Sequence, residues 1–121
     1  MFSDTITITI NAVAKVLNRV NQDGYGSEYF LRDANGSFRL KLRNTSYNDK
    51  SRGGVKVDRH NIELVETVFA VAPATINTVR KYYSVLENDQ TDSVVSSAKF
   101  AVGATGFQTE PNFTKLLNWE S

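Results

Sequence analysis

Residues 35–43, with the sequence NGSFRLKLR, decide the fold class of this chain. An Asn-Gly pair between extended segments is a strong signal for a tight β-hairpin turn. Apolar and cationic residues then alternate. The apolar ones are Phe38, Leu40 and Leu42, and the cationic ones are Arg39, Lys41 and Arg43. This period of two predicts a strand with one apolar side and one wholly cationic side.

Further strands are expected on both sides of this segment. Residues 4–10 contain alternating Thr and Ile, a β-branched pattern typical of a strand. Residues 13–20 fit a helix or a strand by spacing, but they are short, β-branched and follow a clear strand, so we expect a hairpin over residues 1–20. The expected strands are residues 4–10, 13–20, 28–33, 58–72 and 78–88, together with the strand that follows Asn35-Gly36.

The last thirty residues change character. Thr91, Asp92 and Ser93 can cap a helix whose apolar residues follow at helical spacing, and Gly103 and Gly106 are expected to end it. Thr109 can cap a second helix. The chain is therefore expected to be one α+β domain over residues 1–121, with an antiparallel meander of about six strands (sheet residues 27–88) before two helices within 91–118.

The composition excludes several classes of function. Apolar residues make up 40% and charged residues 22%, which is typical of a folded globular chain. With no cysteine and one histidine, the sequence offers neither a disulfide nor a cysteine or multi-histidine metal site. No apolar run reaches the ~20 residues of a membrane span, and residues 1–10 lack a signal peptide's apolar core, so a soluble, uncleaved chain is expected. Nothing frames His60 as a catalytic group, so we expect no enzyme, no metal and no cofactor.

Charge is distributed unevenly along the chain. Residues 1–59 contain ten Lys and Arg against six Asp and Glu (+4), residues 60–85 balance, and residues 86–121 contain two against five (−3). Alternate residues of a strand lie about 7 Å apart, a spacing that suits the phosphates of a nucleic-acid strand. The row of Arg39, Lys41 and Arg43, called the cationic stripe below, could equally belong to an ordinary solvated sheet face. The candidate nucleic-acid-binding residues are Arg39, Lys41, Arg43, Asn61, Glu63, Arg80, Tyr82 and Ser84.

Each candidate has a role that follows from its chemistry. The three cations of the stripe and Arg80 can contact phosphates, and Tyr82 can stack on a base. Asn61, Glu63 and Ser84 can form hydrogen bonds with base edges. A shift of one residue in the register of the last strand would exchange Tyr82 for Tyr83.

A sheet of this size needs a partner. Two short helices cover little of it, so one long edge and part of an apolar side stay open. Pairing with a second copy of the chain is the simplest way to cover both.

Several stretches resemble the coat proteins of single-stranded RNA bacteriophages of the levivirus type. They are residues 21–29 (NQDGYGSEY), 58–64 (DRHNIEL), 67–70 (TVFA) and 115–121 (KLLNWES). The resemblance extends over essentially the whole chain and rests on the order of these stretches and the total length.

The resemblance implies an intertwined homodimer with one continuous sheet, and dimers that assemble into an icosahedral shell (T=3) with the sheet lining its interior. It also implies contact between that sheet and genomic RNA, possibly an operator hairpin, and a location in the virion after assembly in the cytoplasm of a bacterial host. Tyr82 would be the family's stacking tyrosine, with Ser84 as the polar residue beyond it. A dimeric RNA-binding protein or translational repressor that never assembles is the alternative.

Overall fold

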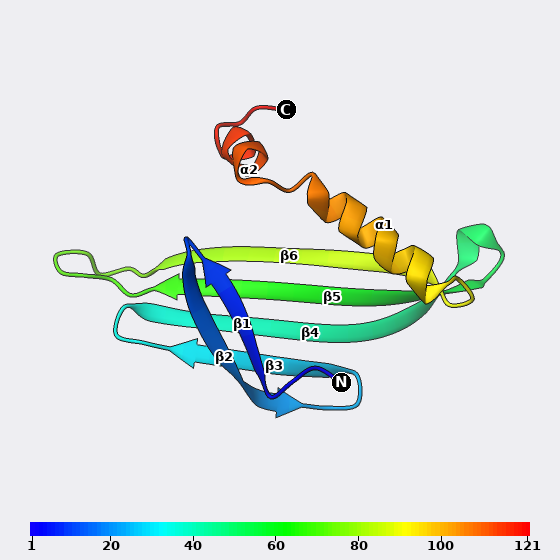
Figure 1. The fold of residues 1–121 in the computed structure, drawn as a ribbon, viewed down its shortest axis with the longest axis horizontal. Helices are drawn as coiled ribbons and strands as arrows, with labels where there is room; N and C mark the ends of the chain where they lie inside the picture. The colour runs from blue at the N-terminus through cyan, green and yellow to red at the C-terminus, as the bar shows by residue number, and fades with distance from the viewer. The chain divides into compact units, whose positions relative to one another are not determined.

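The computed structural model describes residues 1–121 and contains two compact units, residues 1–87 and 88–121. The first unit holds a six-stranded sheet whose strands follow chain order (Figure 1). The strands are β1 (Thr5–Ile10), β2 (Val13–Gln22), β3 (Gly26–Arg32), β4 (Gly36–Asp49), β5 (Val55–Val68) and β6 (Thr78–Asp89). The pairings from β1 to β5 are antiparallel, which confirms the predicted meander and the choice of a strand for residues 13–20.

Two hairpin turns use different chemistry. Asn11 and Ala12, between β1 and β2, have φ angles of 49° and 63°, as a tight turn with left-handed residues requires. Between β3 and β4, the Asp33 carboxylate accepts hydrogen bonds from the backbone N–H of Asn35 (2.8 Å) and of Gly36 (3.0 Å). Gly36 serves close packing here: a Cβ at this position would lie 2.2 Å from the Thr67 carbonyl oxygen. The predicted hairpin is therefore present, with its glycine at the start of β4.

The core lies on the apolar side of β4, beneath the N-terminal hairpin. Leu17, Tyr29, Phe38 and Leu40 are buried together, and β1 adds its isoleucines. The pairing of β2 with β3 is interrupted between Arg19 and Asn21, and such a bulge bends a strand. In Figure 1 the β1–β2 hairpin crosses over β3 and β4, so it forms a second layer on this side of the sheet.

The central pair of strands is longer than the sequence pattern indicates. β4 and β5 pair without interruption from Gly36↔Val68 to Asp49↔Val55, and a short 3₁₀ turn (Lys50–Arg52) joins them. Residues 48–54, which are polar and contain two glycines, thus form the end of β4 and a tight turn. β5 ends at Val68 rather than near Ala72, because the chain turns there and the Ala70 N–H donates to the Asn77 side chain at 2.8 Å.

The second unit contains the two expected helices, α1 (Val94–Gly106) and α2 (Glu110–Leu117). The Ser93 hydroxyl accepts a hydrogen bond from the Ser96 N–H at 3.3 Å and caps α1. Gly103 lies inside α1 rather than at its end. Thr109 precedes α2, whose first turn contains Glu110 and Pro111.

Candidate nucleic-acid interface

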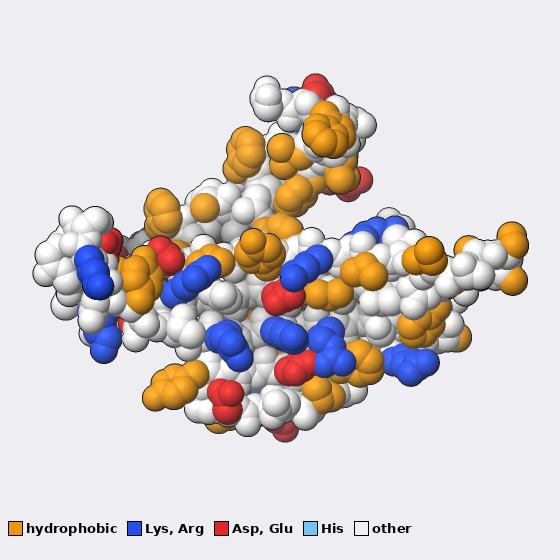
Figure 2. All heavy atoms as spheres, turned by 180° about the vertical axis from the view of Figure 1, so that it is seen from behind, with side chains coloured by type: hydrophobic (Ala, Val, Ile, Leu, Met, Phe, Trp, Pro, Cys, Tyr) orange, Lys and Arg blue, Asp and Glu red, His pale blue; other side chains and the backbone are white.

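The cationic stripe forms one continuous row on β4. Arg39, Lys41 and Arg43 alternate with the buried Phe38 and Leu40, so the stripe points away from the core. Figure 2 shows Lys and Arg side chains gathered over the sheet, with a few Asp and Glu among them. Folding thus produces the two-sided strand that the sequence predicts.

β5 brings two of the candidate residues to the stripe. Lys41 lies directly opposite Glu63, and Arg43 lies directly opposite Asn61. Directly opposed residues of an antiparallel pair point to the same side of the sheet. Asn61 and Glu63 therefore share the face of the stripe, as expected.

β6 presents a different set of residues to this face. Lys81 forms an ion pair with Glu63 at 3.1 Å, whereas Arg80 forms one with Glu66 at 2.8 Å. Glu66 is paired with Phe38 and so points to the core side of the sheet. By alternation along β6, Arg80, Tyr82 and Ser84 lie on the core side. They do not join Arg39, Lys41 and Arg43 as the sequence pattern suggested.

The residues of β6 that lie beside the stripe are each one position away from the predicted ones. Lys81 and Tyr83 share the face of the stripe, with the Lys81 ammonium 6.0 Å from the centre of the Tyr83 ring. Tyr83 is 62% exposed. It is therefore the tyrosine of β6 that is available beside the stripe.

Carboxylates lie among the cations of this face. Glu28, on β3, forms an ion pair with Arg39, and it lies directly opposite Lys41. Glu63 flanks Lys41 from β5. The stripe is therefore wholly cationic along β4 but alternates in sign across the sheet.

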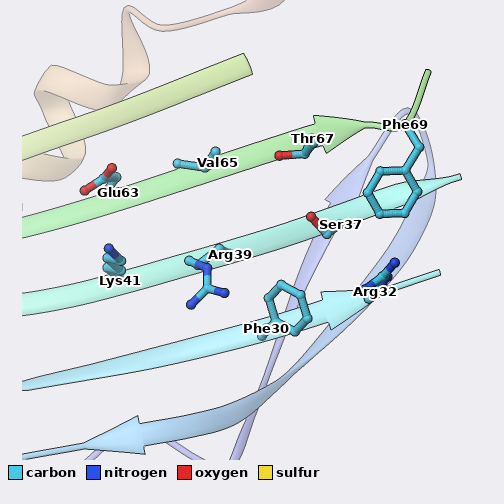
Figure 3. A pocket seen from close by; sticks show the side chains of 9 residues that line it. All are labelled: Phe30, Arg32, Ser37, Arg39, Lys41, Glu63, Val65, Thr67 and Phe69. Carbon is cyan, nitrogen blue, oxygen red and sulfur yellow. The ribbon is translucent and has the colours of Figure 1, made fainter. Parts of the chain in front are cut away.

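Two phenylalanines and two arginines line a shallow depression of about 370 Å³ at one end of the face (Figure 3). The Arg39 guanidinium lies 4.8 Å from the centre of the Phe30 ring, and the Arg32 guanidinium lies 5.2 Å from that of Phe69. Flat rings beside cations can receive unstacked bases and their phosphates. The full lining is Phe30, Arg32, Ser37, Arg39, Lys41, Glu63, Val65, Thr67 and Phe69.

A second hollow of about 310 Å³ lies toward the β2–β3 turn, beside Arg43 and Asn61. The Asn61 Oδ1 atom is buried and has no hydrogen-bond partner. Buried polar atoms are nearly always paired, so a donor group that reached this oxygen, after a small movement of the side chain, would complete its hydrogen bonding. An exocyclic amine of a base has that chemistry.

A hydrogen bond and an ion pair connect β4, β5 and β6 at the end of the face near the β4–β5 turn. The Tyr47 hydroxyl donates to Glu87 Oε2 at 3.1 Å, and Arg59 lies 3.7 Å from the same carboxylate. The hydrogen bond to Glu87 raises the pKa of Tyr47 above its ordinary value. These contacts join β4, β5 and β6 and stiffen the surface that carries the stripe.

His60 and the acidic side chains lie apart from one another. His60 points to the core side, where its Nδ1 lies 2.7 Å from Asn44 Oδ1. No group of three His, Cys, Asp or Glu side chains is placed to hold a metal ion. None of the helices is long and apolar enough to cross a membrane.

Sequence reasoning missed several residues of this face. Glu28, Phe30 and Arg32 follow one another at every second position of β3, which is a detectable signal once that strand is assigned. Phe69 lies beyond the end of β5, but continued alternation from Asn61 and Glu63 through the strand expected over residues 58–72 would have assigned it to this face.

Comparison with known proteins agrees with the fold. The model of the family described as "Phage phiCb5, coat protein" matches residues 3–89. The subunit of a virus-like particle of bacteriophage ESE058 has a TM-score of 0.68 at 13% identity, covering 95% of this chain and 94% of that one. The subunit of a virus-like particle of Beihai levi-like virus 21 has a TM-score of 0.69 at 16% identity, covering 97% and 94%. No curated protein matches the sequence.

These structural likenesses, at such low identity, establish the shared fold. The family match covers most of the chain, including every strand of the sheet and the whole cationic stripe. The chain therefore belongs to the phiCb5 coat protein family and is a coat protein of a single-stranded RNA phage.

Proposed function

We propose that this coat protein forms a homodimer, that the dimers assemble into a closed shell, and that the stripe face of the sheet contacts RNA inside it. The observation that carries the RNA contact is the row of Arg39, Lys41 and Arg43 on an exposed side of the sheet (Figure 2). Phosphate contacts through Lys and Arg supply most sequence-independent affinity for nucleic acids. Asn61, in the same face, adds a hydrogen-bonding group for base edges.

The second unit supports the dimer. Phe100, Phe107, Leu117 and Trp119 are each at least 70% exposed. Several large apolar side chains left exposed on and just after two short helices are typical of a surface that another chain covers. β6 also ends the sheet, and the exposed edge of a long strand is a template for pairing with a second copy.

The shell is supported by the structural relatives. Both are described as virus-like particles, and the alignments cover almost the whole of each chain. A subunit with the same elements in the same order has the parts that such an assembly uses. We infer that this chain assembles in the same manner.

Electron microscopy of the purified recombinant protein tests the shell. Closed particles of uniform size are expected. Dimers alone, at high protein concentration and with RNA added, would refute assembly and leave a free RNA-binding dimer. Elution volume in size-exclusion chromatography separates the dimer from the monomer.

The triple substitution Arg39→Ala, Lys41→Ala and Arg43→Ala tests the RNA-facing side. It should lower the RNA content of the particles, measured by the ratio of absorbance at 260 and 280 nm. The slope of log affinity against log salt should fall by about 2, because each phosphate contact on single-stranded nucleic acid contributes about 0.7.

A matched control removes three exposed cations elsewhere, Lys50 and Arg52 in the turn between β4 and β5 and Lys56 at the start of β5. It changes the net charge equally and should leave RNA content nearly unchanged. Equal losses in the two variants would show that total charge, rather than the stripe, holds the RNA.

A further inference from the structure

The charges of the stripe face are arranged as a row across four strands. Glu28 of β3 lies directly opposite Lys41 of β4, which lies directly opposite Glu63 of β5. Glu63 in turn forms an ion pair with Lys81 of β6 at 3.1 Å. The row therefore alternates negative, positive, negative and positive, and Figure 3 shows Lys41 and Glu63 level with each other on neighbouring strands.

Of the three stripe cations and Lys81, two are thus already in ion pairs within the protein, and a third is flanked by carboxylates. Arg39 is paired with Glu28, Lys81 is paired with Glu63, and Lys41 lies between the two carboxylates. Arg43 differs, because its opposite residue on β5 is the neutral Asn61 and its opposite residue on β3 is Gly26. A phosphate that approaches Arg39, Lys41 or Lys81 must compete with a carboxylate of the chain.

We propose that Glu28 and Glu63 act as internal competitors of RNA phosphates on this face. They align the cations in the absence of RNA, offset the repulsion among them, and limit how tightly RNA is held. This inference rests on the proposed RNA contact and assigns Glu63 a role opposed to binding. It also implies that the unopposed Arg43 is the strongest single phosphate site of the stripe.

The competition weakens binding by a predictable amount. A unit charge about 7 Å from a phosphate, in a medium close to water, changes affinity by about threefold at low salt. Removing one carboxylate should therefore tighten binding about threefold, and removing both about tenfold. Because surface charges are screened, the gain should shrink as salt rises.

The test uses Glu28→Gln, Glu63→Gln and the double variant, with a fluorescein-labelled 20-nucleotide oligouridine as the probe. Fluorescence anisotropy at low salt should show affinity rising in the order wild type, single variants and double variant. Thermal melting checks that each variant is folded. The two single variants carry the test if the double variant does not fold.

Glu66→Gln is the matched control. Glu66 is on the same strand as Glu63. Like Glu28 it is paired with an arginine, here Arg80 at 2.8 Å, but it points to the core side. Its substitution changes the net charge equally and should leave the affinity nearly unchanged.

Two results would overturn the inference, and a third would refute the function on which it rests. One is an unchanged or weaker affinity in the folded Glu28 and Glu63 variants, while the wild-type protein binds the probe. Another is an equal gain from Glu66→Gln, which would reduce the effect to total charge. Absence of binding by every variant and the wild type would instead refute the proposed RNA contact itself.

Discussion

The proposal that the Lys81 side of β6 contacts RNA can be tested with two neighbouring cations. Lys81 is ion-paired with Glu63 on the stripe side, and Arg80 is ion-paired with Glu66 on the core side. Both side chains are more than half exposed, at 56% and 65%, so replacing either by alanine removes one surface charge without opening the core. The two variants therefore differ mainly in the side of the sheet that loses its charge.

Lys81→Ala should weaken RNA binding for two reasons. Loss of one phosphate contact lowers the slope of log affinity against log salt by about 0.7, which corresponds to about 2.5-fold in affinity over a fourfold change in salt. In addition, Glu63 loses its partner at 3.1 Å and its charge acts on Lys41 alone. Arg80→Ala should change neither the slope nor the affinity.

Fluorescence anisotropy with the labelled oligouridine, at salt concentrations from about 50 to 200 mM, measures both quantities. Tyr83→Ala and Tyr82→Ala provide a second pair of variants, in which only the first should weaken binding, by about 1–3 kcal/mol if the ring stacks on a base. A larger effect from Arg80→Ala than from Lys81→Ala would refute the assigned side of β6. Equal effects of the two would show that β6 contributes only long-range charge.

Three further predictions concern the sheet itself and are read from urea midpoints. Gly36→Ala should destabilise the protein by about 1–3 kcal/mol, because the new Cβ would lie 2.2 Å from a backbone oxygen. Gly24→Ala, with open space around the new Cβ, should be nearly neutral, and similar losses of stability at both sites would contradict this explanation. Leu17→Ala removes a fully buried side chain beneath the N-terminal hairpin and should cost about 3 kcal/mol, and a loss below about 1 kcal/mol would mean that the hairpin is not packed as described. The Asn35 N–H holds the pKa of Asp33 below its ordinary value, so ionised Asp33 stabilises the fold above its unfolded-state pKa of about 3.8, and this stability is lost as pH falls through the lower folded-state pKa. Asp33→Asn should therefore lose less stability than the wild type between about pH 6 and pH 3. Identical pH profiles would exclude this contribution.

The parts of the fold that the sequence predicted are those with a one-sided pattern. Thr and Ile alternate in β1, and the isoleucines pack against the core as alternation requires. Residues 38–43 of β4 separate apolar from cationic side chains at every step, so their two sides could be assigned without a structure. Ser93 caps α1 as its side-chain chemistry suggests.

β6 could not be oriented in this way, because its two sides are chemically alike. One side carries Val79, Lys81, Tyr83 and Val85, and the other carries Arg80, Tyr82, Ser84 and Leu86. Each contains a cation, a tyrosine and aliphatic residues, so burial of an apolar face does not distinguish them, and register is then weakly specified by the strand itself. Contacts with Glu63 and Glu66 of the neighbouring strand decide the orientation.

The charge of the candidate site, like the orientation of β6, is decided by residues on neighbouring strands. Along β4 the stripe is wholly cationic, and from the sequence alone it suggests a surface that repels itself and attracts any polyanion. The carboxylates that change this lie 13 and 22 residues from Lys41, on strands whose registers place them opposite it. A pattern of period two contains no information about what lies one strand away. The proposed RNA contact would therefore be weaker than the three cations alone suggest, because three separate strand pairings, from β3 to β6, bring opposite charges into one row.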